Sequence, residues 1–333
     1  MREKTAKANW LIVRPGALGD AVLTLPALTA LLAEGGRVTV LGQRRAWSFL
    51  RPDVAGIVLA DIESAPWRGL FAAEGFAAGA ASPLTGFTGA VLYLGSMREQ
   101  VAEALARAGI ADIIGTTPIR TEWAGVAEHA AERLLAPVAR RLGCSLTVKA
   151  AGLAEDPMLA LTEVEHARAW QGVVPAEGAA GLLALHPGSG GIAKRWPVEA
   201  YCSLAAIVQR RWGLHPLFLI GPAELELLPT LRSVPHSILA IDRPLRDVMA
   251  LIAGSRAYVG NDSGVSHLAG RAVPSLVLFG PTDPRQWRPM GPMVRTLQAD
   301  RGRLDTLPVA AVEAGLAELL GSGVNGAAAQ APP

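Results

Sequence analysis

Cysteine is scarce in this sequence. The 333 residues include only two, Cys144 and Cys202, which lie far apart and in no Cys-x-x-Cys pair. A disulfide framework or a structural zinc site needs more cysteines at closer spacing, so both are excluded. The sequence also has no Asp-x-Asp pair and no cluster of histidines and cysteines. We therefore expect no bound metal.

Charge is low and almost balanced. Charged residues make up 18% of the chain, and 31 basic against 29 acidic residues leave a net charge of +2. No block of basic residues appears, so nucleic-acid binding is not indicated, and any anion site must be local. Hydrophobic residues reach 50%, which is typical of buried parallel strands covered by apolar helices.

Targeting and membrane-spanning segments are not evident. Only four apolar residues, from Trp10 to Val13, precede Arg14, too few for the core of a signal peptide. Residues 75–97 carry no formal charge, but five glycines and Pro83 indicate a loop followed by a strand and not a spanning helix. We expect a soluble cytoplasmic protein.

Three common nucleotide and hydrolase motifs are missing. The first glycine loop, from Gly16 to Gly19, has the spacing Gly-x-x-Gly and lacks the dinucleotide fingerprint, which argues against a nicotinamide enzyme. No Walker sequence is present, which excludes a P-loop NTPase. The absence of Gly-x-Ser-x-Gly argues against a serine hydrolase.

Short apolar runs alternate with helical patterns through most of the chain. This alternation predicts an α/β fold with doubly wound parallel sheets. The expected strands are residues 10–13, 37–41, 57–60, 90–94, 110–115, 182–186, 217–220, 257–259 and 275–279. The expected helices include residues 99–108, 128–142, 162–170, 197–212 and 245–253.

The length suits two domains, each able to bury a core. A polar stretch broken by prolines and glycines separates the two series of strands. We expect an N-terminal Rossmann-like domain over residues 1–160, a linker over 161–180 and a second Rossmann-like domain over 181–320. Residues 321–333 are rich in Gly, Ala and Pro and are expected to form a disordered tail.

The loop after the first strand contains Gly16, Gly19 and Asp20. The glycines permit a tight turn and a close approach of a ligand to the backbone. Asp20 could cap the following helix. Pro26 instead suggests that the main helix begins near that proline, which would leave Asp20 in a separate turn and free to act as a base.

The loop after the strand at residues 182–186 reads PGSGGIAKRWP. Glycines expose the backbone around Ser189 and Gly190, and Lys194 adds a positive charge, an arrangement that suits a diphosphate. The alternative is an ordinary turn with solvated basic residues. After the next strand, Glu224 either binds a ribose diol or complements a helix N-terminus.

A third polar loop follows the strand at residues 257–259. It presents Asp262, Ser263 and Gly264 at the start of a helix, with His267 one turn further along. Free backbone N–H groups at a helix start can bind an anion, and Asp262 can accept hydrogen bonds from sugar hydroxyls. The alternative is that Asp262 or Ser263 only caps the helix.

These landmarks, in this order, resemble glycosyltransferase family 9, the ADP-heptose:lipopolysaccharide heptosyltransferases. The resemblance is carried by RPGALGDAVLTLPAL, VLYLGSMREQ, HPGSGGIAKRWP, LIGPAEL and YVGNDSGVSHLAGRAVPSLVLFGPTDP. It implies a GT-B fold, in which two doubly wound Rossmann-like domains face a central cleft. The chain departs from the family at Gly16 and Ala17, where a serine pair is frequent, and at Ala193, where a serine or threonine is frequent.

The resemblance also implies roles for individual residues. Asp20 resembles the general base, with Gly16 and Gly19 in the acceptor-side loop. Donor-binding positions are matched by Ser189, Gly190, Lys194, Glu224, Asp262, Ser263, Gly264 and His267. Lys194 matches the lysine on the donor phosphates and Glu224 the glutamate on the ribose. The implied reaction is an inverting, metal-independent transfer without a cofactor.

The expected function is transfer of heptose from ADP-heptose to an inner-core lipopolysaccharide acceptor, either Kdo or heptose. The partners would be a nucleotide sugar and a lipid-linked saccharide, with peripheral contact at the cytoplasmic face of the inner membrane and no nucleic acid. The alternatives are a transferase of the same family that uses another nucleotide sugar, a nucleotide-sugar-binding protein without transfer, and an epimerase or hydrolase of the same fold.

Overall fold

A computed structural model describes residues 8–72, 75–76, 82–116, 128–145, 148, 151–173 and 181–322. The chain forms two compact units. One consists of Met1–Ser48 and Pro52–Lys149, and the other of Phe49–Arg51 and Ala150–Pro333. The short segment Phe49–Arg51 therefore belongs to the second unit although it lies within the first half of the sequence.

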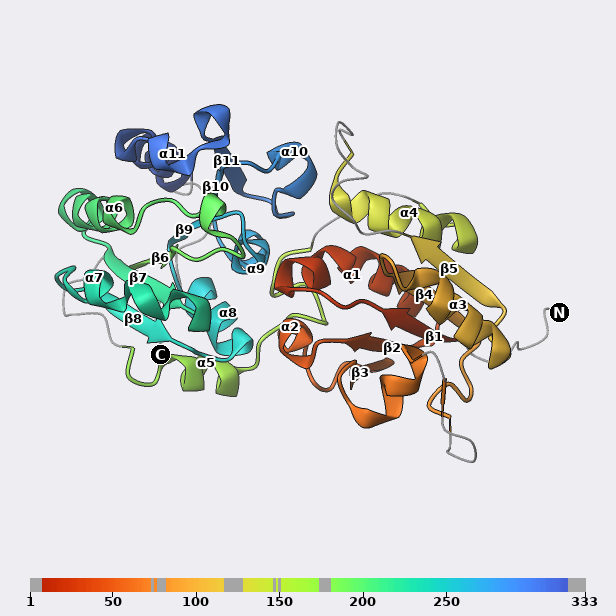
Figure 1. The fold of residues 1–333 in the computed structure, drawn as a ribbon. Helices are drawn as coiled ribbons and strands as arrows, with labels where there is room; N and C mark the ends of the chain where they lie inside the picture. Colours follow the sequence, from red (N-terminus) through yellow and green to blue (C-terminus); the bar gives the residue numbers. More distant parts are fainter. Residues whose placement is uncertain are drawn as a thin grey trace. The chain divides into compact units, whose positions relative to one another are not determined.

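The first unit contains a five-stranded parallel sheet in the order β3-β2-β1-β4-β5 (Figure 1). Its strands are β1 (Asn9–Val13), β2 (Arg37–Gly42), β3 (Ile57–Asp61), β4 (Gly89–Tyr93) and β5 (Asp112–Thr116). Its helices are α1 (Leu18–Ala33), α2 (Arg44–Trp47), the 3₁₀ helix η1 (Ala65–Leu70), α3 (Arg98–Arg107) and α4 (Ala130–Leu142). The chain runs outward from β1 to β3 and then returns to place β4 on the other side of β1, so the strand order reverses between β1 and β4.

The second unit contains a six-stranded parallel sheet in the order β11-β10-β9-β6-β7-β8. Its strands are β6 (Leu182–His186), β7 (His215–Ile220), β8 (Ile238–Ile241), β9 (Ala257–Asn261), β10 (Ser275–Phe279) and β11 (Val294–Gln298). Its α-helices are α5 (Glu163–Trp170), α6 (Val198–Trp212), α7 (Leu228–Arg232), α8 (Leu245–Ala253), α9 (Gly264–Ala272), α10 (Pro284–Trp287) and α11 (Val309–Ser322). Its 3₁₀ helices are η3 (Ile192–Lys194), η4 (Pro222–Leu227), η5 (Asp300–Gly302) and η6 (Leu304–Thr306). Here the order reverses between β6 and β9.

Alternate residues of β6 point into two different cores, as expected for a sheet covered on both faces. Leu183 and Leu185 belong to the core formed with α6 and α11. Leu182 and Ala184 belong to the core formed with α5, α8 and α9. The burial of both faces explains why the strand reads as a continuous apolar run. The predicted doubly wound α/β architecture is thereby confirmed.

Helix α1 differs from the sequence prediction. It begins at Leu18 and continues through Pro26, so the expectation that the main helix begins near Pro26 is wrong. A proline inside a helix costs about 3 kcal/mol. Along α1 that cost is opposed by the burial of residues on both sides of the proline, among them Leu23, Leu25 and Leu28. Asp20 lies in the first turn of α1 and not in a separate turn.

The structure describes only the first part of the predicted linker, residues 161–180. Residues 163–170 form α5, which packs on α8 within the second unit. Residues 174–180 lie outside the described part of the chain. The predicted tail starts within α11, which extends to Ser322, and residues 323–333 are again outside the described part. No helix of the described residues is both long and apolar enough to cross a membrane.

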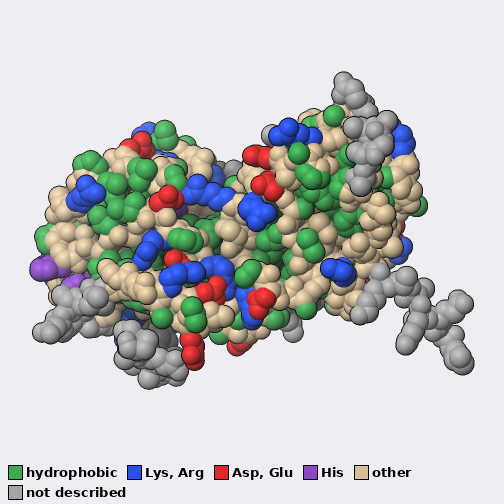
Figure 2. Space-filling view, turned by 90° about the horizontal axis from the view of Figure 1, so that it is seen from below, with side chains coloured by type: hydrophobic (Ala, Val, Ile, Leu, Met, Phe, Trp, Pro, Cys, Tyr) green, Lys and Arg blue, Asp and Glu red, His purple; other side chains and the backbone are tan. Residues whose placement is uncertain are grey.

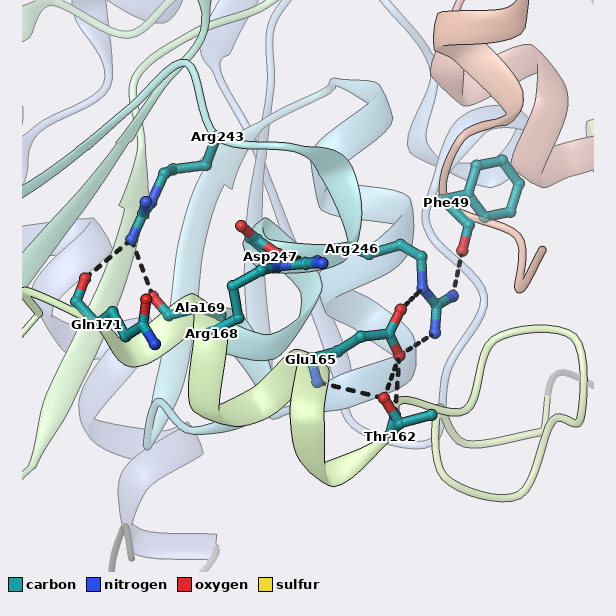
Figure 3. Close-up of polar contacts among 9 residues, drawn as sticks. All are labelled: Phe49, Thr162, Glu165, Arg168, Ala169, Gln171, Arg243, Arg246 and Asp247. Atoms are coloured by element: carbon teal, nitrogen blue, oxygen red, sulfur yellow. Dashed lines mark hydrogen bonds and ion pairs between the residues drawn. The ribbon is translucent and has the colours of Figure 1, made fainter. Parts of the chain in front are cut away.

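Arg246, in α8, and Arg243, just before it, form hydrogen bonds with α5 and hold it in place (Figure 3). Arg246 is buried and donates to both carboxylate oxygens of Glu165, to the Ala160 carbonyl at 2.9 Å and to the Phe49 carbonyl at 2.8 Å. It therefore ties α5 and the short segment Phe49–Arg51 to α8. Arg243 donates to the carbonyls at the end of α5.

On the face of the molecule that Figure 2 shows, the Lys, Arg, Asp and Glu side chains are scattered among hydrophobic ones.

The Glu165–Arg246 pair should contribute stability that depends on pH. The hydrogen bond from Arg246 lowers the pKa of Glu165 from 4.5 to about 2. Stability from a carboxylate whose pKa is lowered on folding is present above the unfolded pKa and is lost as pH falls through the folded value, here from about 4.5 to about 2. Glu165→Gln should therefore cost about 2 kcal/mol at pH 7, as measured by urea unfolding.

The control for this prediction is Asp305→Asn, which removes an exposed carboxylate from its pair with Arg303. Stability should be nearly unchanged in the control, because solvent screens exposed pairs. The difference between wild type and Glu165→Gln should shrink when unfolding is repeated at pH 3. A difference that stayed constant between pH 7 and pH 3 would contradict the electrostatic account.

Candidate functional site

The polar loops predicted from the sequence meet where the strand order of the second sheet reverses. The loop after β6 carries Ser189, and the loop after β9 carries Asp262; β6 and β9 are neighbours. The Ser189 hydroxyl donates to the Asp262 carbonyl oxygen at 2.8 Å. In open α/β sheets, ligands bind outside the carboxyl ends of the strands at such a reversal.

Asn261 joins these two loops, a role that the sequence analysis missed. Its side chain is fully buried and donates to the carbonyls of Pro187 at 2.9 Å and Gly188 at 3.3 Å. Its Oδ1 accepts from the Trp196 N–H at 3.1 Å and from the Tyr201 hydroxyl at 3.2 Å. The N–H group of the Asn261 amide binds the start of the glycine loop, and its oxygen binds residues that follow the loop. Asn261 therefore holds that loop against the end of β9.

Asp262 and Lys194 form the charged centre of this group. Lys194 Nζ lies 2.5 Å from Asp262 Oδ2, and the Thr282 hydroxyl donates to the same oxygen at 2.6 Å. Asp262 is buried, and Lys194 is largely so. Thr282 follows β10, and the sequence analysis did not single it out. Three neighbouring strand ends, those of β6, β9 and β10, thus contribute one side chain each.

The structure separates the two candidate caps of α9. Ser263 is the N-cap, and its hydroxyl accepts from the Ser266 N–H at 3.4 Å. Asp262 does not cap the helix but binds Lys194 and Thr282. Gly264 is the first residue of α9, and His267 is buried one turn further along.

His186, at the end of β6, is a second buried histidine of the group. The Ser263 hydroxyl lies 3.3 Å from its Nδ1. Burial, and to a smaller extent the charge of Arg195, lowers the pKa of His186 to about 4. The imidazole is therefore neutral at pH 7 and adds no positive charge beside the glycine loop. The sequence analysis took His186 only as the end of a strand.

Glu224 lies against the glycine loop through a close contact with Gly188. Its Oε2 accepts from the Gly221 N–H at 3.0 Å, so one oxygen does complement the start of η4. A Cβ at Gly188 would lie only 2.3 Å from Oε1, so a larger residue there would have to displace the Glu224 carboxylate. Burial raises the pKa of Glu224, and Arg195, whose Nη2 is 4.0 Å from Oε1, opposes that rise.

Arg195 links the glycine loop to the turn that carries Glu224. It donates to Glu226 Oε1 at 2.9 Å, and at 3.4 Å to the carbonyls of Ala223 and Ser189. From the sequence, Arg195 was one of the two basic residues of the PGSGGIAKRWP loop. Its contacts connect parts of the protein to one another. Gly190, in the same loop, is exposed and has open space beside it.

The contact between Gly188 and Glu224 leads to a testable prediction. Gly188→Ala should displace the Glu224 carboxylate and weaken binding of a ligand that hydrogen-bonds to it. Loss of one hydrogen bond to a charged group costs about 1.5–3 kcal/mol, so the Kd for such a ligand should rise about 10- to 100-fold. The matched control is Gly191→Ala, where an added Cβ has open space. Equal effects of the two variants on ligand binding would contradict a ligand-binding role of Glu224.

The second candidate group is in the first unit, where the strand order reverses between β1 and β4. Asp20 Oδ1 lies 2.9 Å from Arg14 Nη2, and Asp20 Oδ2 accepts from the Ala17 N–H at 3.1 Å. The Asp20 side chain is 40% exposed. It therefore accepts from a backbone N–H at the start of α1, which confirms the capping role, and it remains accessible to a ligand. The role of Asp20 as a base stays a prediction.

The two glycines of this loop have different surroundings. Gly16 has a φ of +144°, and a Cβ there would lie 2.6 Å from Asp20 Oδ2. A side chain at this position would be strained and would cover one oxygen of Asp20. Gly19 is half-buried in the first turn of α1.

The group in the second unit has the chemistry to bind a molecule that carries both phosphate and hydroxyl groups. Lys194, the Ser189 hydroxyl and the glycine-rich backbone suit phosphate oxygens. Asp262 and Glu224 are carboxylates that can accept from sugar hydroxyls. Within the described residues, no three His, Cys, Asp or Glu side chains are grouped so as to hold a metal ion. Asp20, in the other unit, is an exposed carboxylate suited to accept a proton.

Two solved glycosyltransferases superpose on this chain over nearly its whole length. A glycosyl transferase of family 9 from Veillonella parvula superposes with a TM-score of 0.73 at 18% identity and covers 95% of this chain and 97% of its own. The E. coli ADP-heptose lipopolysaccharide heptosyltransferase II superposes with a TM-score of 0.71 at 21% identity and covers 94% and 99%. The two parallel-sheet units therefore have the GT-B fold.

Sequence comparison gives shorter matches. Lipooligosaccharide heptosyltransferase 2 of Haemophilus ducreyi is 34% identical over 119 residues, which are 33% of this chain and 34% of that protein. Lipopolysaccharide heptosyltransferase 1 of Pseudomonas aeruginosa is 36% identical over 110 residues, 32% of this chain and 30% of that protein. The aligned part thus spans about a third of the length of these relatives.

The family model extends further than these pairwise matches. The model of glycosyltransferase family 9 (heptosyltransferase) matches residues 124–311, which is more than half of the chain. This range includes the glycine loop after β6, the turn with Glu224 and the loop with Asp262. The chain therefore belongs to glycosyltransferase family 9, the heptosyltransferase family.

Proposed function

We propose that this protein transfers heptose from ADP-heptose to an inner-core lipopolysaccharide acceptor, Kdo or heptose, by an inverting reaction that needs no metal ion and no cofactor. The observation that carries the proposal is the Lys194–Asp262–Thr282 group at the strand reversal of the second sheet. It combines a cation for phosphate with acceptors for sugar hydroxyls. The acceptor would be lipid-linked, with peripheral contact at the cytoplasmic face of the inner membrane.

The proposed donor site is in the second unit. Lys194 has three N–H donors, so it can keep its contact with Asp262 and still donate to the diphosphate. Ser189, Gly190, Ser263 and Gly264 would add hydroxyl and backbone N–H donors to the phosphates, with His267 on the adjoining turn of α9. Glu224 would accept from the ribose hydroxyls and Asp262 from the sugar.

In the proposed reaction, Asp20 acts as the general base. The acceptor oxygen attacks the anomeric carbon of the donor, and the bond from that carbon to the phosphate oxygen breaks. Asp20 takes the proton of the acceptor hydroxyl, and ADP leaves with the electron pair. Lys194 and the backbone N–H groups would stabilise the negative charge on the leaving diphosphate.

A second candidate is transfer from a different nucleotide sugar. It is favoured by Ala17 and Ala193, which have methyl groups where the resemblance implies hydroxyl-bearing residues.

The names of similar proteins favour heptose. Two relatives are heptosyltransferases. A solved E. coli heptosyltransferase, 20% identical to this chain with a TM-score of 0.60, was determined with ADP-2-deoxy-2-fluoro heptose. These names support heptose as the first donor to test.

Thermal unfolding with a panel of ligands tests the donor. The panel is ADP-heptose, ADP, a UDP-sugar, a GDP-sugar and NAD. A ligand at about 100 times its Kd adds about 2.7 kcal/mol, which should raise Tm by several degrees. We expect shifts with ADP and ADP-heptose only. A shift confined to a UDP- or GDP-sugar would replace heptose by the second candidate, and no shift with any nucleotide would contradict the donor site itself.

A further inference from the structure

Arg14 is a buried cation at the carboxyl end of β1. Its side chain is 4% exposed, and its backbone N–H donates to the Leu41 carbonyl at 2.9 Å. Nη2 lies 2.9 Å from Asp20 Oδ1, and the guanidinium carbon lies 5.7 Å from the centre of the Tyr93 ring. Nε is buried with no hydrogen-bond partner among the described residues. The guanidinium is thus placed between Asp20 and an aromatic ring.

This placement is costly for folding. Burial lowers the pKa of Arg14, and the nearby charge of Asp20 opposes that effect. Taking a guanidinium out of water costs several kcal/mol, and a well-packed apolar side chain of similar volume is often at least as stabilising. The ionic partner of Arg14 is 40% exposed, which weakens the compensation. Packing alone therefore does not account for an arginine at this position.

The other group that faces Arg14 supplies no ionic partner. Tyr93 belongs to β4, and its hydroxyl donates to the Leu134 carbonyl at 2.8 Å. Burial raises the pKa of Tyr93, so the ring stays neutral at physiological pH and contributes through its π face. Asp20 is thus the carboxylate on which the positive charge of Arg14 acts.

We infer that Arg14 is a positioning residue for the catalytic base, which holds the Asp20 carboxylate in one orientation. The inference rests on the proposed function, in which Asp20 takes the acceptor proton. Arg14 fixes Oδ1, and the Ala17 N–H fixes Oδ2. Gly16 has no side chain to cover Oδ2. A carboxylate has about four lone-pair sites, so two remain for the acceptor hydroxyl.

Arg14 takes no part in the proton balance of the reaction. When the acceptor oxygen bonds to the anomeric carbon, its proton passes to Asp20 and later to water, which reaches the exposed carboxylate. Arg14 itself neither gains nor loses a proton. Its contact keeps the remaining lone pairs of Asp20 in one direction while the proton is transferred.

Arg14→Met is the test, assayed with ADP-heptose and a Kdo- or heptose-terminated lipid A acceptor. At pH 8, kcat should fall at least ~10-fold with the KM of donor and acceptor within about twofold, because neither substrate contacts Arg14. The loss should therefore be confined to kcat at a temperature at which the variant is fully folded. A purely structural role would lower Tm without this split between kcat and KM.

Two further variants keep the inference falsifiable. Arg14→Lys retains the charge but lacks the planar guanidinium, so kcat should fall at least ~3-fold and less than in Arg14→Met. Tyr93→Phe removes only the bond to Leu134 and should leave kcat unchanged. If Arg14→Met does not fold, the Lys variant decides, and wild-type kcat in that variant would overturn the inference.

The outcomes separate the inference from the proposed function. Absence of transfer by the wild-type protein, or full activity of Asp20→Asn, would overturn the proposed function. An active wild type, an inactive Asp20→Asn and a wild-type kcat in folded Arg14→Met would overturn only the role of Arg14. A reduced kcat with unchanged KM values in folded Arg14→Met supports both.

Discussion

Asp20→Asn should lower kcat by at least ~10²-fold and leave donor binding intact. A general base contributes about 10²- to 10⁴-fold to rate, and an amide cannot take the proton of the acceptor hydroxyl. The donor site is formed by residues of the second unit, so the ADP-induced rise in Tm should persist. The measurement is kcat at saturating donor and acceptor, together with the Kd for ADP by calorimetry.

The matched control for this variant is Asp61→Asn. Asp61 is in the same unit and also accepts from a backbone N–H, that of Glu63 at 3.0 Å. Both variants keep a side-chain oxygen that can accept from the backbone N–H, so their stabilities should be similar. Only Asp20→Asn should lose turnover. Equal kcat values for Asp20→Asn and the wild-type protein would exclude Asp20 as the base.

Lys194→Met is expected to have the largest effect on donor binding. The ammonium group supplies charge-assisted hydrogen bonds to phosphate, each about 1.5–3 kcal/mol, so the Kd for ADP should rise about 10- to 100-fold or more. Asp262 would also lose a partner at 2.5 Å and keep only the Thr282 hydroxyl on Oδ2. We therefore expect a lower Tm of the free protein as well as a smaller shift with ADP.

Arg211→Met provides the comparison for Lys194→Met. Arg211 forms an ion pair with Glu313 in the same unit at 2.6 Å, but its side chain is more than half exposed. Loss of this cation should leave the Kd for ADP unchanged and have little effect on Tm. If Lys194→Met bound ADP as tightly as this control does, the phosphate-binding role of Lys194 would be wrong.

The loops around Asp262, which form the proposed donor site, are held in place by contacts within the protein. Hydrogen bonds connect one loop to the next, and most of the atoms that form them are buried. The donors are the side chains of Asn261, Arg195 and Ser189. Fixed dipoles and charges cost little reorganisation when charge develops on a leaving group. The contacts around Asp262 therefore explain how a short loop on each of three strands can act as one site.

Nine of the eleven strands in the described residues were predicted, because most of these are short apolar runs that end close to a glycine or proline; β8 and β11 were missed. The run before Gly260 and the run before Gly280 give β9 and β10 to within two residues. The predicted start of α1 was wrong, because the preference of proline for the first turn of a helix does not account for burial along the whole of α1. Tertiary packing decides such cases.

The individual site residues were predicted by residue type and position after a strand, but their contacts were not. Asp262 and Lys194 are 68 positions apart, and Arg14 contacts Tyr93 from a different strand. Thr282 and Asn261 are ordinary polar residues in the sequence, and only the strand order brings them to Asp262 and the glycine loop. No local pattern contains that order, which is why these partners could not be predicted.

The most direct test of the proposed function is a transfer assay read by mass spectrometry. The protein is incubated with ADP-heptose and an inner-core acceptor that ends in Kdo or heptose, and both the acceptor and the nucleotide are analysed. The account predicts that the acceptor gains one heptose unit for each ADP released. Release of ADP and free heptose with an unmodified acceptor, or an ADP-heptose pool that is bound but never consumed, would contradict it.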